Sequence, residues 1–335
     1  MALANVAAIF ARRGLRTLIV DFDLEAPGLE RYFDIDDVGA RKNPGLIDLV
    51  LAFKRSLTAA ADEDGPNFRD LKAFLYPVFP SAGAGSLYLL PAGRREPESE
   101  MRSYALNVRT FDWQDFYYNW EGEAFFEWFR KTACSGPDGF DVVLVDSRTG
   151  VTEMGGICGY RLADALVMFC AANRQNIAGT RSVADDFRSA GVSSLRRGRQ
   201  LDMVVVPARI EQNDEKRLES FYRRFDSAFK SEVPPALESC GLSFRDLAIP
   251  YELGYAFDER VLSAPDAAPS GSQIESRFAL IADALSLLAK EGRLFEQALS
   301  IRESLRKNSV RAFADVFKLW RESIDGPVAA KQPAA

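Results

Sequence analysis

A short apolar run that ends in two aspartates constrains the fold of this chain more than any other stretch. Residues 18–29 read LIVDFDLEAPGL. A continuous apolar run bounded by charged and turn-forming residues is typical of a buried parallel strand. Because side chains alternate along a strand, Asp21 and Asp23 lie on the same face. Ligands in open α/β sheets bind just beyond the carboxyl ends of strands, so this pair predicts a site for a hard cation and a phosphate-bound water.

Residues 140–150, FDVVLVDSRTG, repeat the pattern of an apolar strand that ends in an acid. Asp146 closes this strand, and Gly150 comes in the next turn. An acid at this position is typical of a Walker B strand, where the carboxylate holds a Mg²⁺-bound water. An apolar strand ending in aspartate is common, so the signal takes its weight from the acid pair upstream. The alternative interpretation is a strand edge that carries solvated acids.

Together the two stretches resemble the ParA/MinD group of P-loop ATPases, in which a D-x-D motif closes the second strand. The string DLEAPGL, residues 23–29, is similar to a subgroup of that family found in bacterial multidomain proteins. The resemblance covers about residues 1–290, with residues 34–140 enlarged relative to the smallest relatives. It implies an α/β fold, a doubly wound and mostly parallel sheet flanked by helices, of the P-loop NTPase kind.

The resemblance also implies ATP and Mg²⁺ as cofactors. In that interpretation Asp23 and Asp146 are the metal residues and organise Mg²⁺, largely through water. Asp21 orients the attacking water and is, with Asp23, a catalytic candidate. Gly150 closes over the γ-phosphate, since a glycine lets the backbone approach closely.

One part of the family pattern is missing from this sequence. The relatives carry a loop of the form K-G-G-x-G-K/R-S/T before their first helix, and no G-x-x-x-x-G-K-[ST] occurs in this chain. That loop supplies the backbone N–H cradle and the phosphate lysine. Residues 1–7 resemble the start of the helix that comes directly after the loop. We therefore expect an N-terminally truncated chain that is weakly active or inactive. We also expect an unfilled slot beside the Asp146 strand, unless the neighbouring strands close up or another segment fills it.

The rest of the pattern alternates strands and helices, as a doubly wound sheet requires. Helices are predicted at 2–13, 46–57, 176–190, 214–231 and 273–290, and strands at 86–90, 164–170, 201–206 and 247–250. Pro207 and Arg209 come after the 201–206 strand, where the loop of the relatives helps recognise adenine. They are assigned to the cofactor loosely, because no asparagine stands there.

Residues 111–129 are dense in aromatic side chains. Such a stripe could stack nucleic-acid bases. At helical spacing it is more often core, and the acids that flank it would repel a nucleic-acid backbone. A core or a protein-partner surface is therefore favoured.

A C-terminal helical appendage is predicted at 291–325, as a pair of helices at 294–305 and 309–324, with a disordered tail at 326–335. The second helix has an apolar stripe, but its basic residues are nearly balanced by acidic ones. Anionic lipid would gain little from such a face. Docking on its own domain or on a partner is favoured over membrane contact.

Composition sets the outer limits. The chain has 335 residues, a net charge of −6, four scattered cysteines and no histidine. The charge argues against nonspecific nucleic-acid binding. The absence of histidine excludes histidine-dependent triads and H-E-x-x-H zinc sites. The cysteines are typical of reduced cytosolic thiols. No signal peptide or membrane-spanning run is found, so we expect a cytoplasmic protein.

The leading hypothesis is an ATP-binding switch of the ParA/MinD type that acts on a protein partner, with a homodimer left open. The opposing hypothesis is a non-catalytic protein-interaction module on the same fold. Measured nucleotide affinity separates the two.

Overall fold

The computed structural model describes residues 1–58, 66–82, 85–136, 138–147, 161–211, 213–253, 261 and 273–305. The strands are β1 (Arg16–Asp21), β2 (Tyr76–Ala82), β3 (Gly85–Leu90), β4 (Val142–Asp146), β5 (Ala165–Ala171) and β6 (Asp202–Ala208). The longer helices are α1 (Ala2–Arg12), α3 (Leu46–Ser56), α4 (Glu98–Thr110), α6 (Gly122–Cys134), α8 (Arg174–Arg188), α10 (Glu215–Phe229) and α12 (Gln273–Leu288). Shorter ones are η1 (Leu29–Tyr32), α2 (Asp37–Lys42), η2 (Leu71–Phe74), α5 (Trp113–Asn119), α9 (Ala190–Leu195), η4 (Lys230–Glu232) and α11 (Pro235–Glu238).

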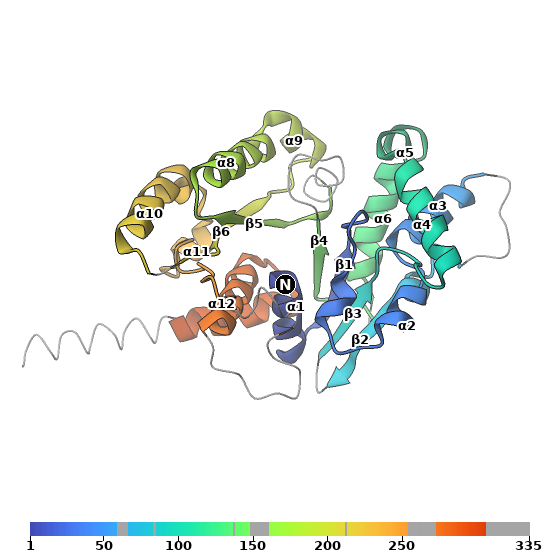
Figure 1. Ribbon diagram of the computed structural model, residues 1–335, viewed down its shortest axis with the longest axis horizontal. Coiled ribbons are helices and arrows are strands. Elements are labelled where there is room, and N and C mark those ends of the chain that lie inside the picture. The colour runs from blue at the N-terminus through green and yellow to red at the C-terminus, as the bar shows by residue number, and fades with distance from the viewer. Residues whose placement is uncertain are drawn as a thin grey trace, which may run out of the picture.

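The described strands form a four-stranded sheet, in the order β2-β3-β1-β4, and a two-stranded sheet of β5 and β6. All pairs are parallel except β2 with β3. Alternate residues of β1 face opposite layers: Leu18 and Val20 belong to a cluster with α3, α5 and α6, while Ile19 packs with α1. Parallel strands covered by helices on both faces are the predicted α/β architecture, which is confirmed (Figure 1).

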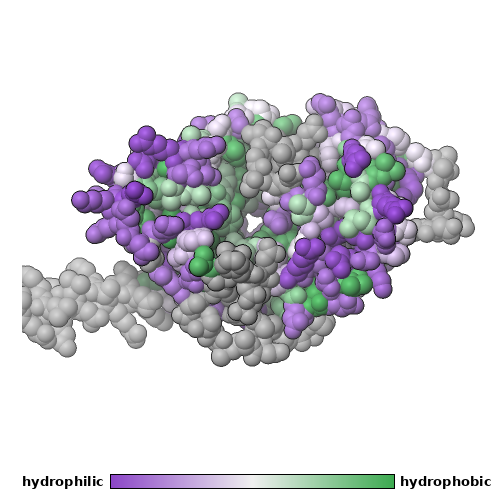
Figure 2. Space-filling view, viewed as in Figure 1, coloured by the Kyte–Doolittle hydropathy of each residue, from purple (hydrophilic) through white to green (hydrophobic). Residues whose placement is uncertain are grey.

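The sheet is interrupted between β4 and β5. In the part of the chain that the structure describes, β4 pairs only with β1, and β5 pairs only with β6. The space-filling view is hollowed at the centre of this face, between the halves built on the two sheets (Figure 2). Among the described residues, no strand pairs with the edge of β4 that faces away from β1, as the expected slot requires. The neighbouring strands have not closed up, and no described segment fills the space between them.

Most of the aromatic segment packs in the core, which is one of the two outcomes favoured from the sequence, while Tyr118 is exposed. A cluster of buried rings joins α3, α5 and α6 to the end of β1, with Phe53, Trp113, Phe116, Phe125 and Phe126 at its centre. Their centroids lie 5.1–6.5 Å apart in tilted, stacked and edge-to-face pairs. Such geometries stabilise beyond the burial of area alone. These rings are closed to nucleic-acid bases.

Two strand predictions differ from the structure. β2 is absent from the predicted strands, because Pro77 and Pro80 argue against a strand. It lies at the edge of its sheet, where a missing N–H is tolerated, and its register shifts between Pro77 and Phe79. The predicted strand at 247–250 is wrong: it contributes only an isolated parallel bridge between Ile210 and Pro250. Leu247 and Ala248 instead form turn hydrogen bonds to residues three positions earlier.

The first helix of the predicted C-terminal pair forms over residues 292–305. It docks on the turn between α1 and β1. Gln297 Nε2 donates to the carbonyl of Arg13 at 2.9 Å, and Arg293 Nη1 lies 3.2 Å from the Asp141 carboxylate. The second helix, at 309–324, and the tail lie outside the described residues. Among the helices described, none is both long and apolar enough to cross a membrane.

Candidate functional site

The two acid-ended strands are neighbours in one sheet. β1 and β4 run parallel in a register that pairs Asp21 with Asp146. The backbone N–H of Phe22 donates to the Asp146 carbonyl at 3.0 Å, which extends the pairing one residue past the strands. Burial raises the pKa of the Asp146 carboxyl, the amino group of Met1 lowers it, and Asp23 raises it. The predicted meeting of Asp21, Asp23 and Asp146 at adjacent strand ends is confirmed.

Asp21 lies at the floor of this site, with only 1% of its surface exposed. Its Oδ2 accepts the backbone N–H groups of Gly28 at 3.1 Å and Leu29 at 3.4 Å. Its Oδ1 is buried and has no hydrogen-bond partner among the described residues. Burial raises the pKa of Asp21 to about 7, against the opposing effect of the two backbone hydrogen bonds. Asp21 therefore fixes the Pro-Gly turn with one oxygen and keeps one acceptor available.

Asp23 is half-buried at the start of the same turn. Its Oδ1 accepts the backbone N–H of Ala26 at 3.3 Å, the local bond by which an aspartate stabilises a turn. The turn thus places Asp23 and Asp146 at the same carboxyl edge. There they interact strongly enough to affect the Asp146 pKa.

A buried polar network that the sequence analysis missed holds this turn in place. Glu30 and Arg95 are both buried, and Arg95 Nη2 lies 3.1 Å from Glu30 Oε1. Tyr104, on α4, donates its hydroxyl to the carbonyl of Leu24 at 2.6 Å. The sequence holds one weak signal, an arginine pair just after the 86–90 strand, but nothing in it pairs Arg95 with Glu30.

The N-terminus of α1 also faces the acids. The helix begins at Ala2 with Met1 as N-cap, makes no side-chain capping bond and has no acid in its first turn. The Met1 amino group lies close enough to Asp146 to lower the pKa of its carboxyl. The first turn of a helix presents N–H groups and the positive end of the helix dipole, which attract anions such as phosphate. Carboxylates for a cation and amides for a phosphate therefore adjoin one another.

These residues fit a hydrated magnesium ion better than a fully protein-ligated one. Among the described residues, no group of three or more acidic, cysteine or histidine side chains could hold a metal ion. Mg²⁺ keeps several waters and is usually bound through one or two carboxylates plus substrate phosphates. Asp23 and Asp146 can supply those carboxylates, and the phosphates would come from the ligand.

The remaining predicted site residues are Pro207, Arg209 and Gly150, and in the described residues none of them is shown to contact the three aspartates. Pro207 lies within β6, where its carbonyl accepts the N–H of Ile249 at 2.8 Å, so it is not in the loop that the sequence predicts for it. Arg209 comes just after the strand with a φ of 56° and lies over the ring of Tyr251 at 5.4 Å. Pro207 belongs to the second sheet, and Arg209 lies directly after it. Gly150 lies outside the described residues.

Solved structures share the fold of this chain. No protein-family model and no curated protein matches the sequence. Among solved structures, apo McdA from Cyanothece is similar at 13% identity over 85% of this chain and 93% of that one, with a TM-score of 0.53. An ATP complex of a Cyanothece McdA variant is similar at 14% identity over 87% of this chain and 94% of that one, with a TM-score of 0.50. A ParA family ATPase from Chlorobium tepidum TLS is similar at 16% identity over 83% of this chain and 91% of that one, with a TM-score of 0.46.

At these identities the likeness shows the fold alone. The chain has the ParA/MinD-like α/β fold that its acid-ended strands predicted. The roles of Asp21, Asp23 and Asp146 stay predictions.

Proposed function

We propose that this chain is the nucleotide-binding part of an ATP-dependent switch of the ParA/MinD type. One observation carries the proposal: Asp21 and Asp146 end adjacent parallel strands in register, beside Asp23 and the uncapped N-terminus of α1. This is the edge at which open α/β sheets bind ligands. The similar McdA structure that contains ATP supports the choice of nucleotide.

In this proposal Asp23 and Asp146 would hold a hydrated Mg²⁺ beside the phosphates of ATP. The free oxygen of Asp21 orients the attacking water. The amides of the first turn of α1 face the phosphates. Gly150 closes over the γ-phosphate, and Pro207 and Arg209 lie on the adenine side. The bound metal supplies charge neutralisation of the phosphates.

We further propose that the 335-residue chain binds ATP weakly and hydrolyses it slowly or not at all. The sequence holds no phosphate loop, so the lysine and most of the N–H cradle are missing from the site. β4 has a described strand neighbour on one side only, which supports the addition of one more strand on the other side. A strand and loop placed ahead of Met1 would run through the slot and end at α1. The proposed switch would act in the cytoplasm on a protein partner, through a homodimer.

The test compares two forms of the protein. One is the 335-residue chain, and the other carries an apolar strand and a K-G-G-x-G-K-T loop directly ahead of Met1. Titration calorimetry with Mg²⁺ and ATP, and a steady-state phosphate-release assay, are run on both. We expect the extended form to bind ATP at least about tenfold more tightly, a difference of roughly 1.4 kcal/mol. Only the extended form should turn over.

Variants of the extended form assign the residues. Asp146→Ala should remove Mg²⁺-dependent turnover. Asp202→Asn changes a matched acid at the opposite, amino end of β6 and should leave turnover unchanged. Turnover by the 335-residue chain that depends on Asp146 would contradict the claim of inactivity. A folded extended form that binds no nucleotide would favour the protein-interaction module.

A further inference from the structure

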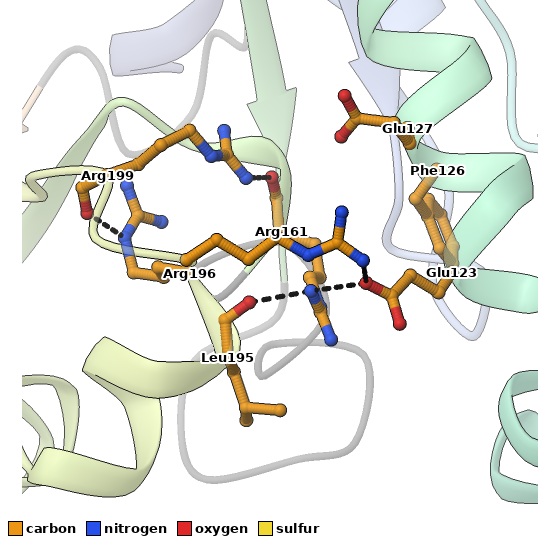
Figure 3. Close-up of a pocket in the computed structure, with 8 residues that line it drawn as sticks. Glu123, Phe126, Glu127, Arg161, Leu195, Arg196 and Arg199 are labelled. Carbon is orange, nitrogen blue, oxygen red and sulfur yellow. Dashed lines mark hydrogen bonds and ion pairs between the residues drawn. The ribbon is translucent and has the colours of Figure 1, made fainter.

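A second polar site lies away from the carboxylates, between α6 and the loop that joins α9 to β6. It is a cavity of about 150 Å³. Its charged lining consists of Arg161, Arg196, Arg197, Arg199, Glu123 and Glu127. The two glutamates project from α6 on one side, and the end of α9 with the arginines after it forms the other side (Figure 3). The proposed nucleotide site uses none of these residues.

The acids of the cavity already have cationic partners. Glu123 Oε1 accepts from Arg161 Nη1 at 2.9 Å and from Arg197 Nη2 at 2.7 Å. Glu127 pairs with Lys131, one turn further along α6, at 3.3 Å. The hydrogen bond to Lys131 lowers the pKa of Glu127. The charges of Arg199 and Arg130 lower that pKa further. Both carboxylates therefore already face positive charge from the cluster.

Positive charge remains in excess when the adjoining pair is included. Arg130 on α6 donates to Asp164 at 2.8 Å, and Arg199 Nη1 lies 3.9 Å from the same carboxylate. With Arg130 and Asp164 added to the lining, the cluster holds five arginines and three acids, an excess of two positive charges. Lys131 lies outside the cavity lining and its side chain is 69% exposed, so water screens its charge.

This charge is partly removed from water. Arg196 is only 2% exposed, and its guanidinium donates to the carbonyls of Arg199 and Gln200. Burial lowers the pKa of Arg196, and so does the charge of Arg199. Burial also lowers the pKa of Arg199, with Arg130 as the next cause. Asp164 offsets part of this repulsion between like charges, and a further anion would relieve the rest.

Two guanidinium nitrogens of the cluster lack a hydrogen bond among the described residues, although Asp164 forms ion pairs with both side chains. Arg199 Nη1 and Arg130 Nε are buried and make no hydrogen bond within the part of the chain that the structure describes. An unsatisfied buried donor is costly, more so when it is charged. Two hydrogen bonds to backbone carbonyls hold the arginine side of the cavity in place. Arg199 Nη2 donates to the Arg161 carbonyl, and Arg161 Nη1 donates to the Leu195 carbonyl.

We propose that this cavity binds a phosphate dianion, free or carried as a phosphate monoester on a small ligand. The guanidinium fork matches the spacing of phosphate oxygens, and arginine is the preferred residue for such recognition. A phosphate monoester carries a charge of about −1.5 to −2 near neutral pH, which matches the excess of two. The inference does not rest on the proposed nucleotide site.

The probe is inorganic phosphate, titrated into the full chain at about pH 7.5 by calorimetry with the ionic strength held constant by chloride. We expect saturable binding of one phosphate per chain. Succinate, a dianion without tetrahedral oxygens, should bind at least about tenfold more weakly, or roughly 1.4 kcal/mol. Absence of saturation above the chloride background would overturn the proposal. Succinate binding as tightly as phosphate would overturn the assignment to phosphate.

Variants locate the bound ion. Arg199→Ala should weaken phosphate binding at least about tenfold, and Arg199→Lys should recover only part of it, because a lysine lacks the fork. Arg197→Ala removes a side chain that is 75% exposed, so the fold should tolerate it and binding should fall several-fold. Arg102→Ala, a matched loss of charge at an exposed position on α4, should bind as the unaltered chain does. Equal binding by Arg197→Ala and Arg102→Ala would place the phosphate elsewhere and refute the site.

Discussion

β1 and β4 are neighbouring strands with almost the same apolar pattern, yet they are buried to different degrees. In register, TLIVD of β1 lies beside VVLVD of β4. Every one of those β1 residues is buried, whereas only Val142 of β4 is. The difference lies in their surroundings. β1 has a strand on each side, and among the described strands β4 has a neighbour on one side only. An apolar run thus specifies a strand, and its neighbours decide how far that strand is buried.

The carboxyl end of β1 is held by contacts from outside the sheet. The turn after β1 is held by buried polar contacts of Asp21, Glu30 and Tyr104. Such contacts stabilise only when each partner is present, because an isolated buried charge is strongly unfavourable. β1 and its turn should therefore be sensitive to single substitutions, and β4 should be tolerant until its free edge is covered.

The largest expected effect comes from breaking the buried ion pair behind the turn. Arg95→Met leaves Glu30 charged and buried, which should cost about 3–5 kcal/mol of unfolding free energy. The double variant Glu30→Met, Arg95→Met removes both charges and should recover most of the loss. Chemical denaturation of both variants measures the difference. Equal losses in the single and double variants would mean that the pair does not determine the stability of the turn.

The comparison of the strands is tested most directly at one pair of residues that lie in register. Ile19 in β1 and Leu144 in β4 are paired in register, but Ile19 is fully buried and Leu144 is half-buried. Ile19→Ala should cost about 2–5 kcal/mol, and Leu144→Ala about 1 kcal/mol, because less apolar area leaves water at Leu144. Urea denaturation of the two variants measures both costs.

The form with an added strand ahead of Met1 sharpens this test. If that strand lies beside β4, the cost of Leu144→Ala should rise toward that of Ile19→Ala, and the cost of Ile19→Ala should stay the same. An unchanged cost at Leu144 would argue that the slot is not where the added strand lies.

The next effect is a pH dependence that originates at Asp21. Its pKa is raised from 3.8 to about 7 in the folded chain. The folded state therefore binds the proton more tightly, so this group lowers stability as pH rises from about 4 to 7, with no further change above. The full shift corresponds to about 4 kcal/mol at most. Asp21→Asn should remove this part of the pH dependence and stabilise the chain at about pH 8. Asp202→Asn is the control, and parallel pH profiles for both variants would contradict the assignment.

The sequence was sufficient for the features that depend on local pattern. The acid-ended strands 18–23 and 140–146 could be recognised because strand alternation and the carboxyl-edge rule act within a few residues. β2 was hidden by its prolines, which only an edge position permits. The Glu30–Arg95 pair and the arginine cavity join segments far apart in the chain. No local pattern encodes such a meeting, so these features emerged only from the tertiary structure.

The smallest expected effect concerns the tyrosine hydroxyl over the acid turn. Tyr104 donates to the carbonyl of Leu24 at 2.6 Å in a buried position. Tyr104→Phe keeps the ring and its packing in the aromatic cluster. The carbonyl of Leu24 loses the hydroxyl that donates to it. A buried hydrogen bond contributes about 0.5–1.5 kcal/mol net, so the loss should be close to about 1 kcal/mol. Tyr88→Phe is the control. Tyr88 is a half-buried tyrosine on β3, in the same sheet as β1. Denaturation midpoints should separate the two variants. Equal midpoints would show that the Tyr104 hydroxyl does not hold the turn, and that Asp21 and the buried ion pair fix it without help from α4.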